Sequence, residues 1–442
     1  MGSEGAIGKV KIEHNGQQNF LRTLAMGGMM VSGTAGAQPR PWVVKLLILT
    51  ALGLLLASCG GMSKLGNLFS DSGSSQLQPI PSMPSGEGVK VALLLPITAT
   101  GDQAQIALSM KQAAEMALID AGNSGITLIS KDTAGTAAGA AAAAQAALSE
   151  GAELILGPLL GAEVQAVAPV AQGQNVPVIA FSSSSGVAGN GTYLMSFLPE
   201  EEVSNIVRHI ASTGKTSIAA LLPKVQYGLA VEKALITSGQ RYGVSIAAIE
   251  RFPRNNLAIV DPATKIMAAV NDPSRNIQAL LIAEGGDLLR TLGAALKKAG
   301  YDQNRTQTLG TGLWDNPVTS STPIALGGIY AGVSPDLVQR FDDRYKSSYG
   351  TRPSRLASLA YDAVSLAIIL SKGEAGQRFA AVNITNPEGF QGINGLFRFR
   401  ENGIIERGLA ILQVTSGGVT VLAPAPSRFD SATVSGANSV AN

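Results

Sequence analysis

The sequence predicts an α/β protein with two doubly wound lobes, because short apolar strands alternate with helical segments in two successive series. The stretch 153–186 shows the unit most clearly. Leu154–Leu156 is a short apolar run closed by Gly-Pro, and 164–171 then places valines and alanines at the i, i+3, i+4, i+7 spacing of a helix. Residues 176–181 are apolar without alternation, which is typical of a parallel strand covered on both faces. Ligands bind beyond the carboxyl ends of such strands.

The first series surrounds this unit. Its other expected elements are a strand at 89–96, a helix at 103–121, a strand at 126–130, a helix at 136–149, a strand at 193–197 and a helix at 200–212. Strands and helices that alternate at this spacing indicate βαβ units and a parallel sheet with right-handed crossovers.

The second series begins near residue 217. We expect strands at 217–222, 245–250, 279–283 and 307–310, with helices at 228–242, 261–271 and 286–299 between them. A strand at 327–333 and an apolar helix at 356–371 follow, and 395–421 alternates like a hairpin around Asn402-Gly403. From residue 423 the chain is rich in Ser, Ala, Pro and Asn, which predicts a disordered tail at 423–442.

Composition limits the possible partners and chemistries. The 442 residues include 33 basic and 31 acidic side chains, with no basic block, which argues against nucleic acid as a partner. One cysteine cannot form an internal disulfide, and two histidines offer no His/Cys zinc cluster. A metal site built only from carboxylates stays open, although no spacing suggests one. We therefore expect neither a metal nor a cofactor.

The N-terminal region resembles a lipoprotein leader. Arg40 and Lys45 precede twelve apolar residues at 46–57, too few for a spanning helix of about 20 residues but suited to a signal peptide. This run ends in Leu-Ala-Ser-Cys, which is similar to the bacterial lipobox. The resemblance implies cleavage after 1–58 and lipidation of Cys59, and the following Gly60 favours sorting to the outer membrane. A secretory signal with an incidental cysteine, or an N-terminal membrane anchor, are the alternatives.

Residues 60–88 are rich in Gly, Ser, Pro and Gln and have no helical or strand period. This composition predicts a flexible tether, with a span of roughly 30 Å. The leader would thus occupy 1–59 and the tether 60–88.

Three segments from 89 onward resemble a known family. VALLLPITATG, ILGPLLGAEVQAVAPVAQGQNVPVIAFSSSSG and VQYGLAVEKAL are similar to the leucine/isoleucine/valine-binding branch of the type I periplasmic binding proteins. The resemblance covers about 89–422 and implies two lobes that close on a ligand by hinge motion. It implies one lobe at 89–212 plus 332–390 and another at 213–331 plus 391–422. The GPLL and GTGLWD segments resemble more narrowly the penicillin-binding-protein activators, which are outer-membrane lipoproteins with this fold.

The same resemblance implies candidate ligand-binding residues. In amino-acid binders a serine after the third strand holds the ligand carboxylate, but 159–162 is Leu-Leu-Gly-Ala and lacks it. The remaining candidates are Ser183, Ser184 and Ser185 after the fourth strand, Tyr227 in the cleft, and Asp315 or Glu284 as the partner of an ammonium group. Trp314 would either stack on the ligand or act as a hydrophobic plug at the lobe interface.

The serine loop does not predict an enzyme. The sequence lacks a G-x-S-x-G motif, and His209 is the one histidine beyond the leader. Thr213–Thr216 resembles the end of a P-loop, but histidine occupies position 209, where the motif needs glycine.

We therefore expect a non-catalytic, lipid-anchored periplasmic protein that captures a small polar, amino-acid-like solute for an ABC permease. The alternative is an outer-membrane lipoprotein that activates a peptidoglycan synthase.

Overall fold

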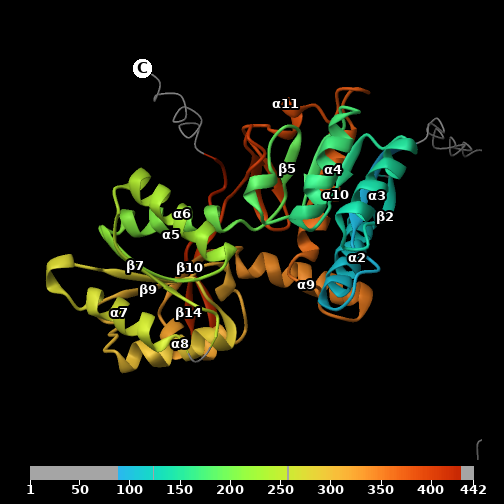
Figure 1. The fold of residues 1–442 in the computed structure, drawn as a ribbon. Helices are drawn as coiled ribbons and strands as arrows, with labels where there is room; N and C mark the ends of the chain where they lie inside the picture. The colour runs from blue at the N-terminus through green and yellow to red at the C-terminus, as the bar shows by residue number, and fades with distance from the viewer. Residues whose placement is uncertain (1–87, 123, 256–257, 430–442) are drawn as a thin grey trace, which may run out of the picture. The chain divides into compact units, whose positions relative to one another are not determined.

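The computed structural model describes residues 88–122, 124–255 and 258–429, which lie within one compact unit and form two α/β lobes (Figure 1). The expected leader with Cys59 and the tether up to residue 87 lie outside the described residues. Among the described helices, none combines the length and the apolar character that a membrane crossing requires.

The first lobe contains a five-stranded parallel sheet. Its order is β2-β1-β3-β4-β5, built from β1 (Val89–Leu95), β2 (Ile126–Asp132), β3 (Leu154–Leu156), β4 (Val178–Ala180) and β5 (Thr192–Leu194). One face packs against α2 (Asp102–Ala121) and α10 (Ala357–Ser371), and the other against α3 (Ala137–Ser149) and α4 (Gly161–Gln172). β1, β3 and β4 are buried on both faces along most of their length, which explains why these strands are apolar without alternation, whereas the edge strand β2 is only partly buried.

The second lobe contains a seven-stranded sheet of order β15-β14-β10-β9-β8-β6-β7. Its strands are β6 (Ser217–Pro223), β7 (Ser245–Phe252), β8 (Ala279–Ile282), β9 (Gln307–Leu309), β10 (Ile329–Gly332), β14 (Ala410–Thr415) and β15 (Gly418–Ala423). Helices α5 (Pro199–Ser212) and α6 (Gln226–Tyr242) cover one face. Helices α7 (Val260–Val270) and α8 (Gly286–Lys298) cover the other. β6 to β10 are parallel, whereas β14 runs antiparallel to β10.

A small antiparallel sheet completes the first lobe. It consists of β11 (Phe390–Gly392), β12 (Gly395–Phe399) and β13 (Ile405–Arg407), and its aromatic side chains enter the core beneath α10. The expected hairpin at Asn402-Gly403 is confirmed: Gly403 has a φ of 79°, a conformation that glycine adopts without strain.

The packing differs from the expected lobe boundaries in two places. Helix α5 was assigned to the first lobe, yet Val203, Ile206 and Val207 are buried with the second sheet. Conversely, 395–407 was assigned to the second lobe, but Phe397 and Phe399 are buried with the first. The chain therefore crosses to the second lobe before α5, returns to the first between β10 and α10, and crosses again after β13.

Two further segments differ from the sequence prediction. Helix α9 (Pro335–Tyr349) was not expected, because only Phe341 and Tyr345 of its residues are buried. The described part of the expected tail, up to residue 429, is packed: Pro426 lies against Gly408, and the Arg398 guanidinium stacks on the Phe429 ring at 4.3 Å.

Candidate functional site

A cavity of about 450 Å³ opens at the carboxyl ends of β6 and β8. Ligands bind at this edge in open α/β sheets, because the loops that follow the strands converge there. The lining residues come from those loops and the starts of the next helices: Pro223, Val225, Tyr227, Arg254, Ala283, Glu284, Gly285, Gly286, Leu313 and Asn316.

Tyr227 enters this cavity from the first turn of α6. The helix starts tight against β6, since a Cβ on Gly228 would lie 1.9 Å from the Pro223 carbonyl oxygen. The Tyr227 hydroxyl donates to Thr311 Oγ1 at 2.7 Å. Burial raises the pKa of Tyr227, and the neighbouring Glu202 raises it further. With its proton committed to Thr311, the phenol oxygen can accept a hydrogen bond from a solute.

Glu284 lies in the same cavity but is already paired. Its two carboxylate oxygens accept from Arg254 Nε at 2.9 Å and Nη2 at 3.2 Å, and the Gly285 amide adds a third bond at 3.1 Å. Such a bidentate pair fixes both partners. Glu284 is buried, whereas the Arg254 side chain is 55% exposed. The group that the cavity presents to a solute is therefore a guanidinium rather than a free carboxylate.

Trp314 lies beneath the cavity rather than in its wall. The indole is fully buried, and Nε1 donates to the Glu284 carbonyl oxygen at 3.0 Å. Gly310 and Gly328 leave room for the ring, since a Cβ on either would lie within 3 Å of it. The ring belongs to the core of the second lobe, whereas the sequence left open stacking on a ligand or a plug at the lobe interface.

Asp315 belongs to an adjacent ionic cluster. Its carboxylate lies 3.4 Å from Arg355 Nε, and Arg355 also lies 3.8 Å from Glu202. Glu202 accepts from the Gly312 amide at 2.8 Å, and burial raises its pKa against the opposing effect of Arg355. The Arg355 guanidinium stacks on the Phe197 ring at 4.7 Å. Both acidic candidates for binding an ammonium group thus face an arginine.

The serine loop belongs to the first sheet and does not line this cavity. Ser183 and Ser184 are exposed, and Ser185 begins a short 3-10 turn. Buried Ser182 accepts from the Ser184 amide at 3.1 Å, and Gly161 packs against both side chains. The loops after β3 and β4 therefore lie side by side, as expected of neighbouring parallel strands.

Three residues of this region were missed by the sequence analysis: Glu202, Arg254 and Arg355. Glu202 was interpreted only as one of three acidic residues at a helix N-terminus, a pattern that gives no sign of burial. Arg254 and Arg355 occupy loops without any motif. Among the described residues, no group of three His, Cys, Asp or Glu side chains could hold a metal ion.

Comparisons with known proteins agree with this architecture. A family model described as periplasmic binding protein matches residues 88–419. No curated protein matches the chain. A putative branched-chain amino acid ABC transporter from Rhodospirillum rubrum is similar with a TM-score of 0.66 and 19% identity, covering 76% of this chain and 100% of that one.

Two further solved structures show the same likeness. A branched-chain amino acid ABC transporter periplasmic ligand-binding protein from Burkholderia xenovorans has a TM-score of 0.63 and 15% identity, covering 76% of this chain and 94% of that one. A solute-binding protein of an ABC transporter from Rhodopseudomonas palustris, in complex with 3,4-dihydroxybenzoic acid, has a TM-score of 0.57 and 20% identity, covering 77% and 97%. At these identities the structures establish the fold. Since the family model spans well over half of the sequence, the chain belongs to the type I periplasmic binding proteins of the leucine/isoleucine/valine-binding kind.

Proposed function

We propose that this protein is a non-catalytic, lipid-anchored periplasmic receptor that captures a small polar solute between its lobes and delivers it to an ABC permease. The observation that carries the proposal is the cavity at the ends of β6 and β8, with the Tyr227 hydroxyl and the Arg254 guanidinium in its wall. The anchor rests on the lipobox-like sequence that ends at Cys59, and Gly60 after it favours the outer membrane.

The charges around the cavity favour a carboxylate as the group that the solute presents to this lobe. Arg254 is half exposed, so its guanidinium reaches the cavity even though it pairs with the buried Glu284, and Asp315 pairs with Arg355. An ammonium group would have to compete with those arginines, because an unpaired buried charge costs several kcal/mol. Amino acids and simpler carboxylic acids both satisfy the carboxylate requirement, and the proteins of known structure include one bound to an aromatic carboxylic acid.

A thermal-shift screen tests this proposal. Amino acids and aromatic or aliphatic carboxylates are added to the full chain, and a true solute at about 100 times its Kd should stabilise the fold by about 2.7 kcal/mol. Absence of any stabilising compound among both classes would contradict the proposal.

Variants of the arginine pair then identify the site. Replacing both partners, Arg254→Gln with Glu284→Gln, keeps the pair neutral and should weaken binding of a carboxylate at least tenfold, because a charge-assisted hydrogen bond contributes about 1.5–3 kcal/mol. Arg290→Gln on α8 is the matched control, since Arg290 is exposed and pairs with Asp287 outside the cavity. Equal affinity in the double variant and the control would place the solute elsewhere.

The alternative function, activation of a peptidoglycan synthase, rests on the GPLL and GTGLWD resemblance alone. Affinity purification of the anchored protein distinguishes the two. Recovery of a permease supports uptake, and recovery of a synthase supports the alternative.

A further inference from the structure

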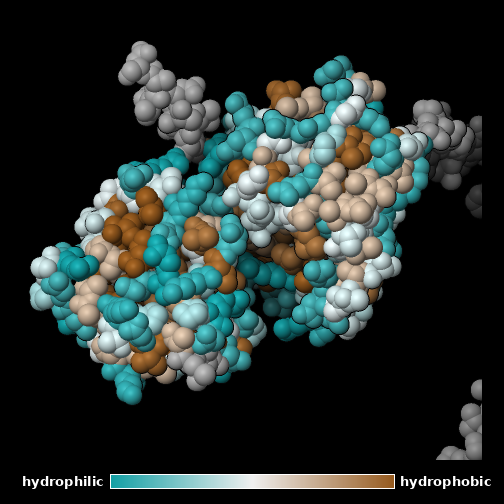
Figure 2. Space-filling view, viewed as in Figure 1, coloured by the Kyte–Doolittle hydropathy of each residue, from teal (hydrophilic) through white to brown (hydrophobic). Residues whose placement is uncertain are grey.

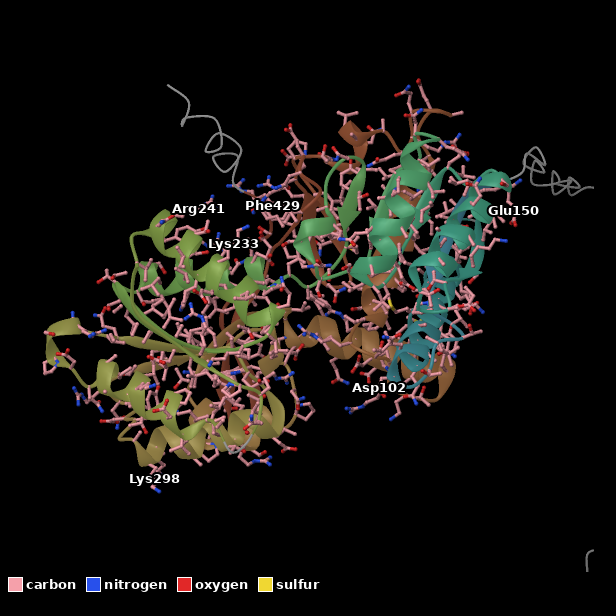
Figure 3. The ribbon with its side chains drawn as sticks, viewed as in Figure 1. Asp102, Glu150, Lys233, Arg241, Lys298 and Phe429 are labelled. Carbon is pink, nitrogen blue, oxygen red and sulfur yellow. The ribbon has the colours of Figure 1, made fainter. Side chains whose placement is uncertain are left out.

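A second, smaller cavity lies where α5 and α6 of the second lobe meet β12 and β13 of the first. Its volume is about 60 Å³. Figure 3 shows Arg241 of α6 and Phe429 of the C-terminal segment near each other in the upper part of the view. This cavity shares no lining residue with the solute cavity.

Arginines dominate the wall of this cavity. Five line it, against two glutamates, Glu201 and Glu406. The arginines are Arg208, Arg241, Arg400, Arg407 and Arg428. They come from α5, α6, the β12–β13 hairpin and the C-terminal segment, so four separate parts of the chain bring positive charge to one place.

The two glutamates do not neutralise this excess. Glu201 pairs with Arg400 at 3.2 Å, and Glu406 pairs with Arg400 at 3.4 Å and with Arg398, outside the wall, at 2.9 Å. Both carboxylates are thus committed to the hairpin arginines.

Three arginines of the wall, Arg208, Arg241 and Arg428, can offer their positive charge to a ligand. Within the described part of the chain, Arg208, Arg241 and Arg428 make no ion pair with a carboxylate closer than 4.0 Å. Arg208 donates to the Asn205 amide oxygen at 2.7 Å, and Arg241 stacks on the Tyr242 ring at 5.5 Å. Arg241 and Arg428 are exposed, so they can approach a ligand without leaving the core.

Arg407 adds a buried cation to the wall. It is 3% exposed, its Nε donates to the Ser196 carbonyl at 3.0 Å, and it stacks on Phe197 and Phe397. Its Nη1 is buried without a hydrogen-bond partner among the described residues. Burial lowers the pKa of Arg407 to about 10, although the buried Asp362 carboxylate partly offsets this effect. A buried charge that lacks full pairing is costly, and an anion beside it would offset that cost.

We propose that this cavity binds a tetrahedral oxyanion, a phosphate or sulfate group. Guanidinium groups bind such oxyanions through paired N–H donors. A volume of about 60 Å³ suits a group of about the size of one phosphate. Because the wall comes from both lobes, the anion also links them at the point where the chain crosses.

Calorimetry on the full chain in detergent tests this proposal. Inorganic phosphate and sulfate are titrated at constant ionic strength against sodium chloride, since exposed charges are screened by salt. We expect saturable binding of one anion per chain, and at least a tenfold loss of affinity in the double variant Arg241→Gln, Arg428→Gln. Arg305→Gln is the matched control, because Arg305 is an exposed arginine of the second lobe outside this cavity, and it should retain wild-type affinity.

A second titration identifies the source of the phosphate group. Phosphatidylglycerol in mixed micelles displaces inorganic phosphate if the cavity takes a lipid headgroup, and leaves it bound if the cavity takes the free ion. Either result supports an oxyanion site. No saturable binding of phosphate, sulfate or lipid, or equal affinity in the double variant and the control, overturns it. These outcomes are independent of the solute screen, because the variants leave Tyr227 and Arg254 intact.

Discussion

Replacing Trp314 with phenylalanine should weaken the fold and leave solute binding nearly unchanged. The indole is fully buried under the solute cavity, and its Nε1 donates to the Glu284 carbonyl at 3.0 Å. Phenylalanine loses that hydrogen bond, which contributes about 1 kcal/mol. It also leaves part of the ring site between Gly310 and Gly328 empty, at a cost of roughly 1 kcal/mol. We therefore expect the free energy of unfolding to fall by about 2 kcal/mol.

Urea unfolding followed by far-UV circular dichroism measures this loss without relying on tryptophan fluorescence. The matched variant is Tyr227→Phe, which removes a hydroxyl from the cavity wall but no core volume. It loses the hydrogen bond to Thr311, so it should lower the unfolding free energy by about 1 kcal/mol and weaken binding of the solute found in the screen. The reasoning is refuted if Trp314→Phe keeps the wild-type midpoint and abolishes solute binding, since the indole would then contact the solute.

Three further predictions follow from particular contacts. A Cβ on Gly312 would lie 2.0 Å from the Glu202 carboxylate, so Gly312→Ala should lower the unfolding free energy by more than about 2 kcal/mol in the same urea assay. Burial raises the pKa of Glu201 from 4.5 to about 7. The folded state therefore holds this proton more tightly than the unfolded state, and the resulting stability is complete below pH 4.5. It is lost as the pH rises through 7, by about 3 kcal/mol at most. Glu201→Gln should therefore flatten the stability profile over that range, and an unchanged slope would count against it. Cys59→Ala should move the protein from the membrane to the soluble periplasmic fraction on immunoblots, whereas retention in the membrane would favour an uncleaved anchor.

The strands and most helices could be predicted because burial on both faces leaves a signal in the sequence. β1 has five fully buried consecutive residues, and α10 buries twelve of its fifteen. Helix α9 gave no such signal, since it buries only Phe341 and Tyr345. The lobe boundaries failed for a different reason. A helix such as α5 looks the same whichever sheet it covers, and the partner that decides its lobe is made by distant residues.

The sequence predicts where the candidate site lies in the sheet, but not which charged groups the site presents to a solute. Tyr227 and Glu284 follow strands that end at one edge of the sheet, so both were expected near a ligand and both line the cavity. The pairing of Glu284 with Arg254 joins residues 30 positions apart, and nothing in either loop indicates it. Trp314 illustrates the same limit, because the glycines that make room for its ring lie at positions 310 and 328.

The net charge of the chain says little about where charged side chains gather on the folded molecule. A formal charge of +2 without a basic block argues against a long polyanion such as nucleic acid, which needs many cations along one surface. It does not exclude a single small anion, because a few arginines suffice when distant segments bring them together. The cavity between α5, α6 and the β12–β13 hairpin is built in this way, with each segment contributing one or two arginines. The fold, rather than the composition, therefore decides which anions this protein can bind.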